Sequence, residues 1–135
     1  MSQENVEIVL ASIAAYNAED LDAQMATYSP DAVIVIDATM ASVGMPASFH
    51  GREALRSFLG SETADWRGRY QASEVRAVGA NRVLCRGDWG GRGAASGIEA
   101  YQSTSLLFTL RDHLISRVEF FRDSDMALKA AEHQE

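Results

Sequence analysis

In the N-terminal part of the chain, helical patterns of apolar side chains surround one short apolar run. Apolar residues recur at helical spacing over 4–17 and again over 52–59, and Asp20 is placed to cap a shorter helix over 21–28. We therefore predict three helices in this region. Between the second and the third lies DAVIVIDATM, residues 31–40, whose five consecutive apolar side chains predict a strand that is buried on both faces.

From residue 69 onward the pattern changes to strands that are separated by short polar or glycine-containing turns. The extended segments are YQASEVRAVG, RVLCRGDWGGRG, IEAYQSTSLLFTL and HLISRVEFFR. Strands joined by such short turns must be antiparallel neighbours. Helices followed by a meander of strands predict an α+β fold: a cone-shaped, curved antiparallel β-sheet packed against three N-terminal helices, with a pocket enclosed between them. The last segment, DSDMALKAAE, fits either a short helix or a frayed tail.

The composition fits a single domain over residues 1–135, because 47% hydrophobic residues supply a sizeable core. No segment is apolar for long enough to span a bilayer, and the polar N-terminus MSQENVEIVL lacks the basic region of a signal peptide. Cys85 is the only cysteine, so no internal disulfide can form, which favours a reducing, cytoplasmic compartment. The net charge of −7 argues against nucleic acid and anionic membranes as partners.

Four stretches of the chain carry a resemblance to a known family: AYNAEDLDAQMATYSPDAV, FHGREALRSFL, GANRVLCRGDWGGRGAASG and LFTLRDHLISRVEFFRD. They resemble the SnoaL-like proteins of the nuclear-transport-factor-2-like superfamily, which also holds ketosteroid isomerases, limonene epoxide hydrolases and scytalone dehydratases. The resemblance covers nearly the whole chain and implies a cone-shaped α+β barrel that commonly dimerises through the outer sheet face. It does not settle the reaction, because the superfamily includes cofactor-free enzymes as well as pure binding proteins.

The catalytic residues of the ketosteroid isomerases are poorly matched in this chain. The resemblance places the tyrosine of their oxyanion hole at Ser12 and the protonated acid of the sheet near Leu106. The position of their base falls on Ile36 without gaps, and on Asp37 only if one residue is inserted. Tyr28 matches a tyrosine that supports the catalytic network of those enzymes. We therefore do not expect ketosteroid isomerisation.

Two carboxylates are candidates for a catalytic base. Asp37 directly follows the apolar run, where it either points into the cavity as a base or shapes a turn at the strand end. By strand alternation, Arg117 and Glu119 share a face with Ile115 and Phe121, and the resemblance makes this the face that lines the cavity. There the arginine would keep the glutamate ionised. The alternative is an ion pair on the open sheet face or at a dimer interface.

His50 is a further candidate, because it precedes the helix over 52–59 and an ordinary histidine titrates near neutral pH. It would shuttle protons at the pocket mouth, or it is a surface or capping residue. The histidines and Cys85 do not have the spacing of metal ligands, so we predict no metal site.

Several large side chains are placed to form the wall of a ligand pocket. Core packing is the alternative explanation for them. The predicted substrate-binding residues are Trp66, Trp89, Tyr28, Thr104, Leu106, Phe108 and Phe121.

These observations predict a cytoplasmic, cofactor-free protein whose pocket binds a small hydrophobic organic molecule. Two functions stay open. One is proton transfer by a pocket carboxylate, as in an isomerase, cyclase, hydratase or epoxide hydrolase. The other is non-catalytic ligand binding, or a scaffold role as a dimer. The resemblance implies a homodimer in either case.

Overall fold

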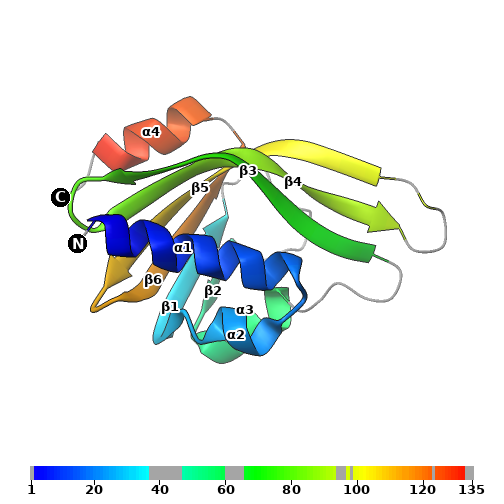
Figure 1. Cartoon of the computed structure of the whole chain (residues 1–135), viewed down its shortest axis with the longest axis horizontal. Coiled ribbons are helices and arrows are strands. Elements are labelled where there is room, and N and C mark those ends of the chain that lie inside the picture. The colour runs from blue at the N-terminus through cyan, green and yellow to red at the C-terminus, as the bar shows by residue number, and fades with distance from the viewer. Residues whose placement is uncertain are drawn as a thin grey trace.

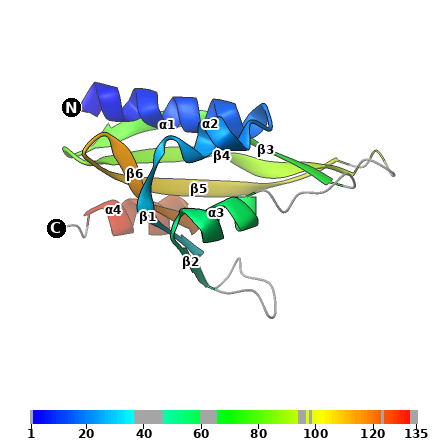
Figure 2. The same cartoon turned by 90° about the horizontal axis from the view of Figure 1, so that it is seen from below.

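We analysed a computed structural model, which describes residues 2–36, 47–59, 66–93, 97, 99–122 and 124–132. This part of the chain forms four helices and six strands (Figures 1 and 2). In chain order they are α1 (Ser2–Asn17), α2 (Leu21–Met25), β1 (Tyr28–Ile36), β2 (Ser48–His50), α3 (Arg52–Leu59), β3 (Trp66–Val78), β4 (Arg82–Gly93), β5 (Glu99–Arg111), β6 (Leu114–Phe121) and α4 (Ser124–Glu132).

The strands form one open sheet in the order β2-β1-β6-β5-β4-β3. The last four strands are antiparallel neighbours, as their short turns predict, but β1 pairs with β6 in parallel, so the sheet is mixed. Turn lengths could not predict this pair, because most of the chain separates β1 from β6 and no short turn joins them. The predicted α+β fold is confirmed.

Helices cover both faces of the sheet. In Figure 2, α1 lies on one face and α4 on the other. The main core, on the α1 side, contains Val9, Ile34 and Val118, while a second cluster under α4 contains Leu84 and Leu107. Neighbouring residues such as Val83 and Leu84 point to opposite faces, which explains why the central strands are apolar throughout.

Polar side chains fix α1 to the sheet at both ends. Near its start, the amide of Asn5 donates to the carbonyl of Ala80 at 3.1 Å. At its end, the Asn17 amide donates to the Tyr70 carbonyl at 2.9 Å, and the Tyr70 backbone N–H donates to Asn17 Oδ1 at 2.8 Å. The position of α1 over the sheet is therefore set by specific hydrogen bonds as well as by apolar packing.

The structure differs from the expected boundaries where α2 meets β1. The helix ends at Met25, and Tyr28 already belongs to the strand. A proline such as Pro30 is typical of the residues that follow a helix end. In the structure it lies in β1, where the pairing with β6 shifts register between Tyr28 and Val33. A proline is tolerated there because a residue in an irregular stretch of strand does not have to donate a backbone hydrogen bond to the neighbouring strand.

Three further observations complete the comparison with the expected elements. Strand β2 lies at the end of the stretch 38–51, whose small and polar composition is typical of a long irregular loop. The C-terminal segment that fitted a helix or a frayed tail forms α4. Within the described ranges, no helix is both long and apolar enough to cross a membrane.

Candidate functional site

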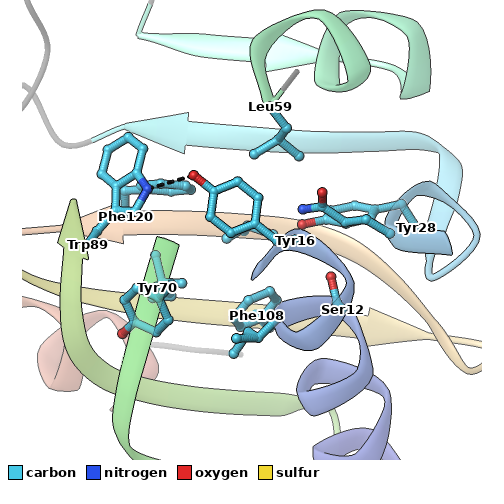
Figure 3. Close-up of a pocket in the computed structure, with 12 residues that line it drawn as sticks. Ser12, Tyr16, Tyr28, Leu59, Tyr70, Trp89, Phe108 and Phe120 are labelled. Carbon is cyan, nitrogen blue, oxygen red and sulfur yellow. Dashed lines mark hydrogen bonds between the residues drawn. The ribbon is translucent and has the colours of Figure 1, made fainter. Parts of the chain in front are cut away.

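A small cavity lies between the helices and the concave face of the sheet (Figure 3). The space that the centre of a water molecule can occupy in it is about 50 Å³, and all the empty space within it, open solvent included, is about 460 Å³. The described residues that line it are Ser12, Ile13, Tyr16, Gln24, Tyr28, Leu59, Tyr70, Trp89, Leu106, Phe108, Val118 and Phe120.

Three buried polar side chains meet in the wall of this cavity: Ser12 of α1, Gln24 of α2 and Tyr28 at the start of β1. Their exposed fractions are only 2%, 4% and 3%. Burial raises the pKa of Tyr28 to about 12, and hydrogen bonds with Ser12 and Gln24 oppose this rise. Tyr28 therefore keeps its proton at neutral pH, and the three side chains form an uncharged polar cluster.

Local structure at α2 positions one member of this cluster. The carboxylate of Asp20 caps the helix by accepting a hydrogen bond from the Ala23 N–H at 3.1 Å, as the sequence predicts. The Thr27 hydroxyl donates to the carbonyl of Gln24 at 2.6 Å and closes the turn that leads into β1. The short helix thereby holds Gln24 close to Tyr28.

A second polar contact links α1 to the sheet beside the cavity. The indole Nε1–H of Trp89 donates to the hydroxyl of Tyr16 at 2.9 Å, as the dashed line in Figure 3 shows. Trp89 also packs edge-on against Phe120, with ring centroids 5.7 Å apart. Both members of the hydrogen bond are only partly buried, whereas the cluster of Ser12, Gln24 and Tyr28 is almost completely buried.

Two further titratable groups near the cavity, Tyr70 and Cys85, are also neutral at physiological pH. The hydroxyl of Tyr70 donates to the Thr104 carbonyl at 2.8 Å. Its pKa is raised far above the usual range by burial first and by the nearby Cys85 and Asp88. Burial raises the pKa of the Cys85 thiol to about 12, so this cysteine is an inert core residue.

The described lining contains no Asp, Glu, His, Lys or Arg side chain. Asp37, the first predicted base, lies outside the described residues. The structure therefore shows a cavity that supplies hydrogen bonds and apolar contacts, without a charged group among its described walls.

A bulge in β6 changes the expected orientation of the second predicted base. Thr109 of β5 pairs with Arg117, but the next residue, Leu110, pairs with Ile115. Ser116 is thus an extra residue in β6, and it reverses the alternation of side chains along the strand.

As a result, Arg117 and Glu119 lie on the face opposite the cavity, whereas regular alternation from Ile115 placed them in its wall. Ile115, Val118 and Phe120 belong to the main core instead. The Arg117 Nε and Glu119 Oε1 atoms are 3.5 Å apart, and the two side chains are 46% and 18% exposed. This is the arrangement that we named as the alternative, an ion pair on the other sheet face.

His50 lies on the same outer face and not at the cavity. It pairs with Val33 across β2 and β1, and Val33 in turn pairs with Arg117. Its Nε2 is 3.0 Å from the hydroxyl of Ser48, and the side chain is exposed. The structure thus brings His50, Arg117 and Glu119 to one face of three neighbouring strands, away from the cavity.

Of the predicted substrate-binding residues, Tyr28, Trp89, Leu106 and Phe108 line the cavity, and their contact with a ligand stays a prediction. The others do not belong to its described lining. Thr104 is fully buried behind Tyr70, Phe121 packs in the cluster under α4, and the side chain of Trp66 is outside the described part of the structure.

Sequence reasoning did not select Gln24, Tyr16 or Tyr70 as site residues. For Ser12 a signal was present, because it interrupts the apolar stripe of α1 one turn before Tyr16. A polar residue in a buried stripe needs partners, and here they are Tyr28 and Gln24. Among the described residues, no group of three or more His, Cys, Asp or Glu side chains is arranged to hold a metal ion.

The fold has close counterparts among solved structures. A cystatin-fold protein from Novosphingobium aromaticivorans is 28% identical with a TM-score of 0.72, over 90% of this chain and 99% of that one. TerC, co-crystallised with polyporic acid, is 23% identical with a TM-score of 0.75, over 96% and 98%. A candidate polyketide cyclase from Xanthomonas campestris is 22% identical with a TM-score of 0.76, over 96% and 98%.

No curated protein matches the chain. The family profile of the SnoaL-like domain, however, matches residues 9–118, which is most of the sequence. This match agrees with the resemblance drawn from the motifs and with the α+β fold of the structural counterparts. The chain belongs to the SnoaL-like domain family.

Proposed function

We propose that this protein binds a small, mostly apolar organic molecule in the cavity between α1 and the sheet. The observation that carries the proposal is the lining itself: apolar walls with a few converging, buried polar groups are typical of small-molecule sites. The descriptions of two proteins of the same fold support it: TerC was co-crystallised with polyporic acid, and the other protein is a candidate polyketide cyclase.

A cavity-filling substitution tests this proposal. Ile13 and Ile8 are both partly buried residues of α1, but only Ile13 lines the cavity. We expect Ile13→Phe to abolish the binding of small neutral ring compounds, measured by chemical-shift changes of the Trp89 indole N–H. Ile8→Phe should leave binding unchanged. Equal binding by the wild type and Ile13→Phe would place the ligand elsewhere and refute the proposal.

For catalysis, we propose cofactor-independent proton transfer, in an isomerase, cyclase or hydratase, with Asp37 as the base. Glu119 is the less suitable candidate because its ion pair with Arg117 is on the opposite face. With an identified substrate, Asp37→Asn should lower turnover about 100-fold or more, and Glu119→Gln should not. Unchanged turnover in Asp37→Asn would leave non-catalytic ligand binding as the function.

We further propose a cytoplasmic homodimer. The resemblance to SnoaL-like proteins supports it, because these proteins commonly dimerise through the outer sheet face, and here His50, Arg117 and Glu119 lie on the outer face of β1, β2 and β6. Light scattering at micromolar concentration should give twice the mass of the chain, and a monomeric mass would refute the dimer.

A further inference from the structure

We propose that an open groove beside α1 is the docking site for an amphipathic helix of another protein, one that carries lysine or arginine next to its apolar face. The groove lies between the N-terminal half of α1, the junction of α2 with β1, and the turn between β5 and β6. None of its described lining residues also lines the cavity. It is therefore a second site, and the proposal does not depend on what the cavity binds.

The groove is much larger and more open than the cavity. The space that the centre of a water molecule can occupy in it is about 450 Å³, compared with about 50 Å³ in the cavity. In Figure 2, α1 lies at the top of the molecule, and no other described element covers its outer side. A surface hollow of this size has room for several side chains of a partner protein, whereas small-molecule sites usually enclose most of their ligand.

Apolar side chains contribute to every wall of the groove. They are Ile8 and Ala11 of α1, Ala26 directly after α2, and Leu114 at the start of β6. Ala11 and Ala26 are exposed, and Ile8 and Leu114 are partly exposed. Beside Ala11, Leu10 is 45% exposed and continues the apolar surface along α1. A partner that covers these side chains with its own apolar residues removes apolar area from water, which favours docking.

The charged side chains of the groove favour a basic partner. Glu4 and Glu7 both line the groove, both are exposed, and their spacing places them on one face of α1. Across from them, His113 Nδ1 is 3.7 Å from Glu4 Oε1, and this side chain adds a positive charge only when it is protonated. The whole chain has a net charge of −7. A second copy would bring the same negative charge to the groove, so a basic partner is electrostatically favoured over self-association.

The surrounding fold favours a helix over an extended strand as the occupant. Leu114 belongs to β6, which already pairs with β1 on one side and with β5 on the other. This strand therefore has no free edge to which an added strand could form backbone hydrogen bonds. A helix satisfies its own backbone groups, places apolar side chains in a groove at helical spacing, and can hold lysine or arginine against Glu4 and Glu7.

A set of model peptides tests this proposal on the full-length protein. Each is a fluorescein-labelled helix of about 14 residues that carries leucine along one face and either lysine or glutamate on the other. By fluorescence anisotropy at low ionic strength, we expect the lysine peptide to bind about tenfold or more tightly than the glutamate peptide. A lysine peptide of the same composition in scrambled order controls for charge alone, and it should bind about fivefold more weakly than the ordered one.

Two matched pairs of variants locate the binding site. Ala11 and Ala23 are both exposed helical alanines, but only Ala11 lines the groove. Ala11→Gln should therefore weaken binding of the lysine peptide about fivefold by filling the groove, and Ala23→Gln should not. Glu7→Gln should weaken binding about threefold, as the loss of one exposed ion pair does. Glu132→Gln removes the same charge from an exposed position on α4 and should have no effect.

Each of the following outcomes would overturn the proposal. Equal binding of the lysine and glutamate peptides would show that the groove does not favour a basic partner. Equal binding to Ala11→Gln and Ala23→Gln would place the peptide elsewhere on the protein. If no peptide binds, the groove is not a docking site for such a helix, and a lower mass of Ala11→Gln by light scattering would then assign it to a second copy of the chain.

Discussion

At the scale of single residues, one glycine allows β3 and β4 to pack closely. The register between these strands shifts between Ala72 and Glu74, and the backbone of β3 passes directly over Gly87. A Cβ atom on Gly87 would lie 2.2 Å from the carbonyl oxygen of Gln71. The atoms that this Cβ would meet belong to the backbone of β3, so they cannot move away without disturbing the sheet.

We expect Gly87→Ala to lower the free energy of unfolding by about 3 kcal/mol, as a severe overpacking does. Gly79→Ala is the control: apart from its own residue and chain neighbours, no described atom lies within 4 Å of its Cβ position, but its φ of +68° is strained for alanine. That substitution should cost only about 1 kcal/mol. Urea denaturation measures both, and equal losses would show that the contact at Gly87 relaxes easily.

At the scale of elements, the attachment of α1 determines the shape of the cavity, because the helix carries Ser12 and Tyr16. The side chain of Asn17 binds the Tyr70 backbone through both its amide and its oxygen, as a neighbouring strand would. This double hydrogen bond holds the end of α1 that lies next to Tyr16.

Asn17→Ala should lower the free energy of unfolding by about 2 kcal/mol, because two partly buried backbone groups lose their partner. Asn17→Asp should be about as harmful, since its second oxygen would face the Tyr70 carbonyl instead of donating to it. Denaturant titration checks both variants. A fully stable Asn17→Asp protein would mean that only the bond from the Tyr70 N–H matters.

Elements with a regular pattern could be predicted from the sequence, and irregular ones could not. Helical periodicity located α1 and α3, and alternation in the regular strands β4 and β5 placed Trp89, Leu106 and Phe108 on the cavity side. In β6 the same rule failed, because Ser116 adds one residue and turns every later side chain to the other face. Nothing in the local sequence marks Ser116 as a bulge, since the bulge arises from pairing with β5.

At the scale of the whole molecule, buried neutral groups make the free energy of unfolding fall at alkaline pH. Burial raises the pKa of Cys85 from 9.0 to about 12 and that of Tyr28 from 10.0 to about 12. The unfolded chain therefore releases these protons at lower pH than the folded protein. Their contribution to stability is complete below about pH 9 and is lost as the pH rises toward about 12.

The free energy of unfolding should fall by about 1.4 kcal/mol per pH unit for each such group within its range. Urea denaturation between pH 8 and pH 11 measures how steeply the free energy of unfolding falls with pH. Cys85→Ala should remove the part of this slope that the cysteine contributes. An identical slope in wild type and variant would show that the thiol of Cys85 does not contribute.

The parallel pairing of β1 with β6 has a consequence for the order of folding. Ile36 pairs with Phe120, so β1 cannot complete its pairing until β6, which lies far along the chain from it, has been synthesised. Until then, β1 has only the short strand β2 beside it in the sheet. Such non-local contacts slow folding, because the loop between them must close before the pairing can stabilise it. The nascent chain thus exposes apolar side chains of β1 until β6 has emerged, which favours binding by chaperones that recognise apolar segments.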